Sequence, residues 1–222
     1  LTAHAAGLGV EPEFAAVSRV ELAGEIKRVH TGREILEARA VILATGASHR
    51  SLGCPGEAEF QGRGVSYCAT CDGAFFRGKD VAVVGGGNTA LEDALFLANL
   101  CRRVYLIHRR EEFRAQQSAV EAVRSRENID LVLGEQVEKI SGDKLVSAVT
   151  LKSGRELPVS GVFIAVGLAP NTGLFADQVE LENGYILAGE NCHTSLPGVF
   201  AAGDCTGAPY QLAKAVGEGN IA

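Results

Sequence analysis

The feature that most constrains the fold is a glycine-rich hexapeptide that directly follows an apolar run. The run Asp80-Val81-Ala82-Val83-Val84 leads into Gly85-Gly86-Gly87-Asn88-Thr89-Ala90, which matches the pattern G-x-G-x-x-A. Apolar residues then recur at helical spacing as far as Ala98, so a helix is expected here with Asn88 as its N-cap. A strand, a glycine turn and a helix in this order predict a dinucleotide-binding unit, whereas the six residues alone also fit a turn without a ligand.

Each of these residues has its own expected role in dinucleotide binding. Gly85 permits the tight turn, Gly87 lets backbone amides approach a pyrophosphate, and the small Ala90 lets the helix lie against the strand. Asn88 and Thr89 stand at the helix N-terminus, where the backbone supplies positive potential for phosphate groups.

The residues after the next strand indicate which nicotinamide nucleotide binds. A run at 104–107 predicts that strand, and His108, Arg109 and Arg110 follow it, with Arg114 a turn further on. A site for NADH would carry Asp or Glu here for the ribose 2′-hydroxyl, whereas guanidinium groups match a 2′-phosphate. The pattern therefore favours NADPH, and the alternative is the solvated basic start of a helix.

The pair Cys68-Ala69-Thr70-Cys71 predicts redox chemistry. Two thiols at this spacing can close and open a small disulfide ring, so that one thiolate attacks a partner disulfide and the other resolves it. Asp72 follows directly and could donate and accept the proton that thiol chemistry needs. The alternative is a zinc site, which usually requires four N or S ligands. No second C-x-x-C pair exists, and we predict no metal; the remaining candidates are Cys54, Cys101, Cys205, and Cys192 beside His193.

The rest of the chain reads as short strands and one further helix. The expected elements are strands at 17–22, 26–30, 34–38 and 40–44, a polar helix at 111–126, a strand at 129–133, an antiparallel meander at 137–140, 146–151 and 157–166, and a buried strand within 197–204. Thr45-Gly46 and Gly203-Asp204 each end a buried strand. Loops at such ends contact ligands in α/β proteins, so Thr45, Gly46 and Asp204 are candidate binding residues. The alternative for Asp204 is an ordinary turn residue after glycine.

Composition excludes several classes of partner. With 222 residues, 46% hydrophobic and 22% charged, the chain has ordinary globular composition. Its net charge of −6 and its lack of a long basic run argue against nucleic acid. No run of 18 apolar residues and no signal-peptide pattern is present, so we expect a soluble cytoplasmic protein without membrane contact. The sequence contains no methionine, and we therefore interpret it as a fragment.

Five motifs in this order strongly resemble low-molecular-weight thioredoxin reductase, over essentially the whole chain. They are Ala44-Thr45-Gly46-Ala47; Cys68-Ala69-Thr70-Cys71-Asp72-Gly73; Gly85-Gly86-Gly87-Asn88-Thr89-Ala90; His108-Arg109-Arg110 with Arg114; and Gly198-Val199-Phe200-Ala201-Ala202-Gly203-Asp204. Each motif is widespread by itself. Their order and spacing together are specific.

The resemblance implies an α/β fold of two nucleotide-binding, Rossmann-like domains, three-layer β/β/α, with an NADPH domain inserted into an FAD domain. Residues 1–50 and 169–222 would be FAD-domain pieces, and residues 51–168 the NADPH domain with its redox disulfide. The family's N-terminal G-x-G-x-x-G strand is absent and the chain stops at Ala222, within the family's last FAD-domain helix. The resemblance thus implies truncation at both ends, and a homodimer when full length.

The resemblance also implies the activity of an NADPH-dependent thioredoxin-disulfide reductase. Electrons would pass from NADPH through FAD to the Cys68–Cys71 disulfide and on to thioredoxin or a similar small protein disulfide, with Asp72 as the acid. Arg109, Arg110 and Arg114 would clamp the 2′-phosphate. Asp204, Gln211 and Leu212 would contact FAD, although the basic residue that the family usually places between Tyr and Gln is missing at Tyr210-Gln211.

Three alternatives to this function remain open from sequence. One is the flavoprotein reductase of a peroxiredoxin system, and another is a homologue that takes electrons from ferredoxin, against which the arginine set argues. The third, from a different class, is an inactive NADPH-binding fragment.

Overall fold

The computed structural model describes residues 2–222, and they form two compact units. One unit is continuous, His49–Leu168, and the other combines the chain up to Ser48 with Ala169–Ala222. The chain crosses between them in β5 (Ala47–His49) and β14 (Leu168–Pro170), which pair in a two-stranded sheet. Among the described helices, none is both long enough and apolar enough to cross a membrane.

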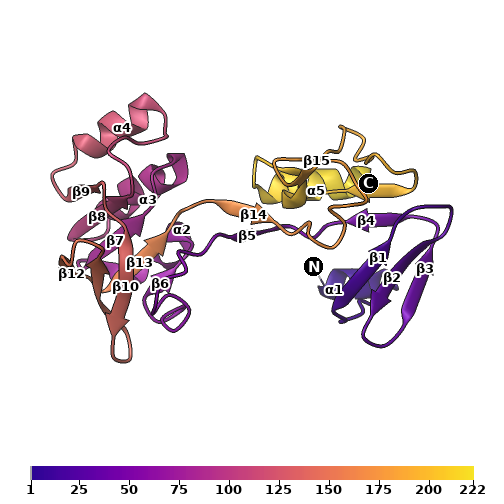
Figure 1. Cartoon of the computed structure of the whole chain (residues 1–222), viewed down its shortest axis with the longest axis horizontal. Coiled ribbons are helices and arrows are strands. Elements are labelled where there is room, and N and C mark those ends of the chain that lie inside the picture. Colours follow the sequence, from indigo (N-terminus) through magenta and orange to yellow (C-terminus); the bar gives the residue numbers. More distant parts are fainter. Residues whose placement is uncertain (1) are drawn as a thin grey trace. The chain divides into compact units, whose positions relative to one another are not determined.

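The continuous unit is built on a five-stranded parallel sheet (Figure 1). Its strand order is β6 (Val65–Ser66), β13 (Gly161–Ile164), β7 (Asp80–Val84), β8 (Arg103–His108) and β9 (Ile129–Leu133). The helices are α2 (Ala69–Asp72), a 3₁₀ turn at Gly73–Phe76, α3 (Asn88–Ala98) and α4 (Gln117–Arg124). A second, antiparallel sheet contains β10 (Val137–Gly142), β11 (Val146–Leu151) and β12 (Glu156–Pro158).

The alternation of side chains along β7 explains the three layers of this unit. Val81 and Val83 pack into a buried cluster with the apolar face of α3, including Leu91. Ala82 and Val84 point to the opposite face and pack with the residues of β10, β11 and β12. Successive strand residues face opposite sides of a sheet, so the part of a strand that is covered on both faces must be apolar, as Val81–Val84 of β7 is. The α/β class expected from sequence is confirmed.

The discontinuous unit contains shorter elements. They are α1 (Thr2–Gly7), an antiparallel sheet of β1 (Val17–Glu21), β2 (Lys27–Thr31) and β3 (Ile35–Ala38), a parallel pair of β4 (Val41–Leu43) with β17 (Val199–Ala201), the hairpin β15 (Leu181–Glu182) with β16 (Tyr185–Ile186), a 3₁₀ turn at Asp204–Thr206, and α5 (Leu212–Ile221). Leu22, Leu43, Phe175, Ile186 and Val199 belong to its buried core.

Two expected elements differ from the structure. The predicted helix at 111–126 is helical only in α4, because the chain before it is bound to the glycine turn: the Arg114 amide donates to Gly86 O at 2.7 Å. The predicted third meander strand at 157–166 is two strands. The chain leaves the antiparallel sheet after β12 and enters the parallel sheet at Gly161, where the Phe76 ring packs 2.4 Å from the position of an added Cβ. A side chain at that position would collide with the ring.

Candidate functional site

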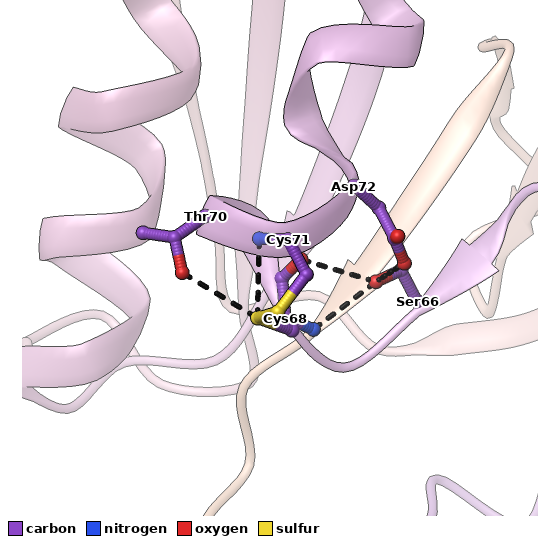
Figure 2. The surroundings of a disulfide bond; sticks show 5 residues. All are labelled: Ser66, Cys68, Thr70, Cys71 and Asp72. Carbon is purple, nitrogen blue, oxygen red and sulfur yellow. Dashed lines mark hydrogen bonds between the residues drawn. A yellow bond between two sulfur atoms is a disulfide. The ribbon is translucent and has the colours of Figure 1, made fainter.

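Cys68 and Cys71 form a disulfide at the start of α2, with their Cα atoms 5.3 Å apart (Figure 2). Cys68 is the N-cap of α2, and its Sγ accepts a hydrogen bond from the Cys71 amide at 3.2 Å, while Thr70 Oγ1 lies 3.4 Å from the same sulfur. Cys71 is exposed and Cys68 is half-buried. The disulfide is therefore open to attack from solvent.

The disulfide is relevant to the alternative interpretation of Cys68 and Cys71 as zinc ligands. Both sulfurs are bonded to each other, so neither is a metal ligand in this state. In the part of the chain that the structure describes, no three His, Cys, Asp or Glu side chains group as metal ligands would. The redox interpretation of this pair is the one that its geometry supports.

Ser66 links the disulfide turn to Asp72, a contact that the sequence analysis missed. Its Oγ donates to Asp72 Oδ2 at 2.7 Å and accepts from the Cys68 amide at 3.1 Å (Figure 2). Ser66 is only 6% exposed, so these bonds are shielded from water. Asp72 and Ser66 also line a cavity of about 340 Å³ together with Phe76 and Lys79. Ser66 thus holds the Asp72 carboxylate, which directly follows Cys71 in sequence, and Asp72 also borders the cavity.

The glycine turn after β7 is packed too tightly for larger residues at two of its three positions. A Cβ on Gly85 would lie 2.3 Å from Ala165 O and 2.7 Å from the Ala90 Cβ, and Gly85 has φ +156°. A Cβ on Gly86 would lie 2.2 Å from the His108 ring, whereas one on Gly87 would have no neighbour closer than 3.9 Å. Gly85 and Gly86 therefore serve the packing, and Gly87 leaves an open approach to the backbone at the N-terminus of α3.

The loop that carries the arginines is attached to this turn. In addition to the Arg114–Gly86 backbone bond, Asn88 Oδ1 accepts a hydrogen bond from the Gln116 amide at 2.7 Å. The prediction that Asn88 is the N-cap of α3 is wrong: Gly87 is the N-cap, and the Asn88 side chain instead reaches the residue before α4. A side chain used in this way could not be found from local spacing, because Gln116 is 28 residues away.

The predicted nucleotide residues occupy different environments. Arg109, Arg110 and Arg114 are exposed, and among the described residues none of their guanidinium groups is in an ion pair. Thr89 is exposed in the first turn of α3, and Ala90 is buried. The arginine side chains are therefore free to meet an anion brought to the glycine turn.

His108 is buried beneath the turn, in contrast to the exposed arginines. Its ring stacks on Phe113 with centroids 5.6 Å apart, and its Nε2 lies 3.1 Å from Glu112 O. Burial lowers the pKa of His108, and the neighbouring charges of Arg110, Arg109 and Arg114 lower it further, against the effect of the Glu112 hydrogen bond. The buried ring packed on Gly86 supports the turn.

A second cavity, of about 360 Å³, lies in the discontinuous unit. It is lined by Asp204, Gln211 and Leu212, which the resemblance predicts as FAD contacts, and by Gly46, a candidate binding residue. Thr45, the other candidate binding residue before this turn, is exposed, and its carbonyl accepts from Asn171 Nδ2 at 2.9 Å, so its backbone supports the turn. The Asp204 carboxylate has no hydrogen-bond partner among the described residues, and it is available to a ligand in the cavity.

The fold and the disulfide together define a class of protein. The family described as "Pyridine nucleotide-disulphide oxidoreductase" matches residues 7–219, and the chain belongs to this family.

Within the family the chain is similar to thioredoxin reductases. It is 48% identical over 211 residues to the thioredoxin reductase of Mycolicibacterium smegmatis, an alignment that covers 91% of this chain and 68% of the relative. It is 45% identical over 220 residues to the bifunctional thioredoxin reductase/thioredoxin of Mycobacterium leprae, covering 95% of this chain and 48% of that one. The solved thioredoxin reductase of Giardia duodenalis superposes with a TM-score of 0.80 at 36% identity, covering 99% of this chain and 75% of that structure. The resemblance expected from the motifs is confirmed.

Proposed function

We propose that this protein is a thioredoxin-disulfide reductase that passes electrons from NADPH through FAD and the Cys68–Cys71 disulfide to thioredoxin. The single observation that carries the proposal is the accessible disulfide at the start of α2, in a chain whose relatives are named thioredoxin reductase. The bifunctional relative from Mycobacterium leprae, named for both partners, supports thioredoxin as the electron acceptor.

The chemistry of the cysteines balances with two electrons and two protons. Reduction of the Cys68–Cys71 bond consumes two electrons and two protons and yields two thiols. One of them, as the thiolate, attacks the partner's disulfide and forms a mixed disulfide. The second thiolate then attacks the sulfur of the first, which restores the Cys68–Cys71 bond and releases the partner as a dithiol. Asp72, held by Ser66, is suited to give a proton to a leaving thiolate and to take one from an attacking thiol.

The residues present fit a nicotinamide nucleotide in the continuous unit. The open position at Gly87 and the free amides at the start of α3 suit a pyrophosphate, and the exposed Arg109, Arg110 and Arg114 suit a 2′-phosphate. The arginine set supports NADPH over NADH, and over ferredoxin as electron donor. The bound nucleotide would be oriented by contacts from one glycine turn and one basic loop, which are joined through Asn88 and Gln116.

The residues of the discontinuous unit fit a flavin dinucleotide. The unpaired Asp204 carboxylate suits a ribityl hydroxyl, and the amides of the first turn of α5, at Leu212, suit a negatively charged or carbonyl oxygen. When bound, FAD supplies a carrier that takes two electrons from a nicotinamide and gives them to a disulfide.

The test is a visible spectrum of the purified full-length protein, followed by NADPH oxidation with oxidised thioredoxin, in the parent and in Cys68→Ser. We expect a flavin spectrum, and turnover that disappears in Cys68→Ser. Thioredoxin reduction that persists without Cys68 would mean that the redox centre lies elsewhere. A protein that binds NADPH but no flavin would favour the inactive NADPH-binding module, and turnover with a peroxiredoxin but not with thioredoxin would favour the other reductase class.

A further inference from the structure

The turn between β17 and α5 carries Asp204 and has an unusual backbone. It begins at Gly203 and ends at Gly207, which have φ of +84° and +105°. Between them lies the 3₁₀ turn Asp204–Thr206. Positive φ at both ends is available to glycine at little cost. The turn's own backbone supplies only two hydrogen bonds, from the Thr206 amide to Gly203 O at 3.0 Å and from the Gly207 amide to Asp204 O at 3.2 Å. Side chains of α5 add further bonds to it.

Lys214, in the first turn of α5, binds this short turn with all of its donors. Its Nζ donates to Gly203 O at 2.9 Å, to Thr206 Oγ1 at 2.7 Å and to Gly207 O at 2.9 Å. A lysine ammonium has three N–H donors, and these bonds use all three. The Lys214 side chain is 14% exposed, so it is withdrawn from solvent and has no donor left for a ligand.

Glu218 completes the same arrangement one helical turn further along α5. Its Oε2 lies 3.3 Å from Lys214 Nζ, accepts from the Gly203 amide at 2.7 Å and lies 3.2 Å from Thr206 Oγ1. Lys214 and Glu218 together therefore contact both ends and the middle of the turn. We call these two residues and Thr206 the turn clamp.

The position of Lys214 is unfavourable for the helix itself. A cation in the first turn opposes the helix macrodipole, which favours anions at the N-terminus and cations at the C-terminus. The contacts of Lys214 with the turn must offset this cost. They leave the Asp204 carboxylate, which lies within the clamped turn, free of protein partners among the described residues and on the wall of the cavity.

We propose that Lys214 and Glu218 are positioning residues of the flavin site, which hold the Gly203–Gly207 turn so that Asp204 faces the cavity. They act through the turn and do not touch the ligand. This inference rests on the proposed function, because it takes the cavity of the discontinuous unit to be the flavin site. It assigns a role to two residues that neither the motifs nor the resemblance single out.

The test measures FAD binding to the full-length apoprotein by quenching of flavin fluorescence. Lys214→Met is expected to weaken FAD binding at least about tenfold, since it removes three charged hydrogen bonds from the turn. Arg33→Met is the matched control, because it removes an exposed cation from the same unit. NADP⁺ affinity, measured by calorimetry, should stay within about twofold in both variants, because its expected site lies in the other unit.

A second pair of variants keeps the inference testable if Lys214→Met does not fold. Thr206→Val removes only the hydroxyl from the turn clamp, and Thr206→Ser keeps it. We expect Thr206→Val to weaken FAD binding several-fold and Thr206→Ser to bind like the parent, with the same far-ultraviolet circular dichroism. Equal FAD affinity in Thr206→Val and Thr206→Ser, or in Lys214→Met and Arg33→Met, would overturn the clamp while leaving the proposed function intact. A parent that binds no FAD would overturn both.

Discussion

The imidazole of His108 occupies the space that a side chain on Gly86 would need, with an added Cβ only 2.2 Å from the ring. His108 is the last residue of β8, Gly86 follows the end of the adjacent parallel strand β7, and both are buried. The His108 ring thus supports the glycine turn 85–87 at Gly86, while the turn stays open at Gly87.

Substitutions at Gly86 and Gly87 are expected to separate packing from nucleotide binding. Gly86→Ala forces the His108 ring to move in a packed interior and should lower the free energy of unfolding by about 1–3 kcal/mol. Gly87→Ala meets no atom within 3.9 Å, so its free energy of unfolding should change little, but its methyl group should hinder the pyrophosphate and raise the KM for NADPH. Urea denaturation and steady-state kinetics measure the two effects. Equal loss of stability in both variants would contradict this division.

Arg109 and Arg110 are expected to determine the choice of nucleotide. Changing both to Gln should raise the KM for NADPH by about tenfold or more, because two guanidinium partners of the 2′-phosphate are lost, and should leave the KM for NADH nearly unchanged. Arg124→Gln, at the exposed end of α4, is the control for loss of surface charge. Kinetics with both nucleotides measure the selectivity, and equal effects on NADPH and NADH would remove the assigned role.

Ser66 is expected to matter for proton transfer at the disulfide. Ser66→Ala leaves the Asp72 carboxylate without its 2.7 Å donor, so its position relaxes, and the rate of thioredoxin reduction should fall by about tenfold. Ser66→Thr keeps a hydroxyl and serves as the control. Stopped-flow measurement of thioredoxin reduction by the pre-reduced enzyme isolates this step. A Ser66→Ala rate equal to that of the parent would show that the contact has no part in catalysis.

Tyr67 and Glu57 predict a specific dependence of stability on alkaline pH. Glu57 is buried and accepts from the amides of Leu52 and Gly53 and from Tyr67 Oη at 2.8 Å. Burial first, and then the hydrogen bond and charge of Glu57, raise the pKa of Tyr67 to about 12, from 10.0. The folded state holds the phenol proton of Tyr67 more tightly than the unfolded state does. The contribution of the protonated Tyr67 to the free energy of unfolding is therefore fully present below pH 10 and is lost as the pH rises toward 12.

The measurement for this prediction is the urea midpoint of the parent and of Tyr67→Phe between pH 8 and about 11.5. Tyr67→Phe should be less stable than the parent at pH 8 by about 1 kcal/mol, because one donor to Glu57 is lost. This difference in stability should shrink as the pH rises above 10, because the parent loses stability as its Tyr67 phenol ionises and Tyr67→Phe has no phenol to ionise. A difference that is constant with pH would show that Tyr67 does not titrate as its environment indicates.

Local patterns in the sequence predicted the parts of this protein that depend on neighbouring residues. The disulfide of Cys68 and Cys71 follows from a separation of three residues, and β7, the glycine turn and α3 follow from periodicity and backbone freedom. These features need no knowledge of distant contacts. For the same reason the α/β class was predictable, because one strand that is apolar on both faces already implies cover on both faces of a sheet.

The tertiary structure alone decided which side chains support these features. Asn88 was expected to cap its own helix and instead holds Gln116, and the helix expected from residue 111 begins at Gln117 because the preceding chain bonds to the turn. His108 was grouped with the arginines and instead packs under Gly86. Lys214 and Glu218 have helical spacing like any surface pair, yet they hold a turn near Gly203. Composition and periodicity carry no record of such contacts, because they arise only when folding brings distant segments together.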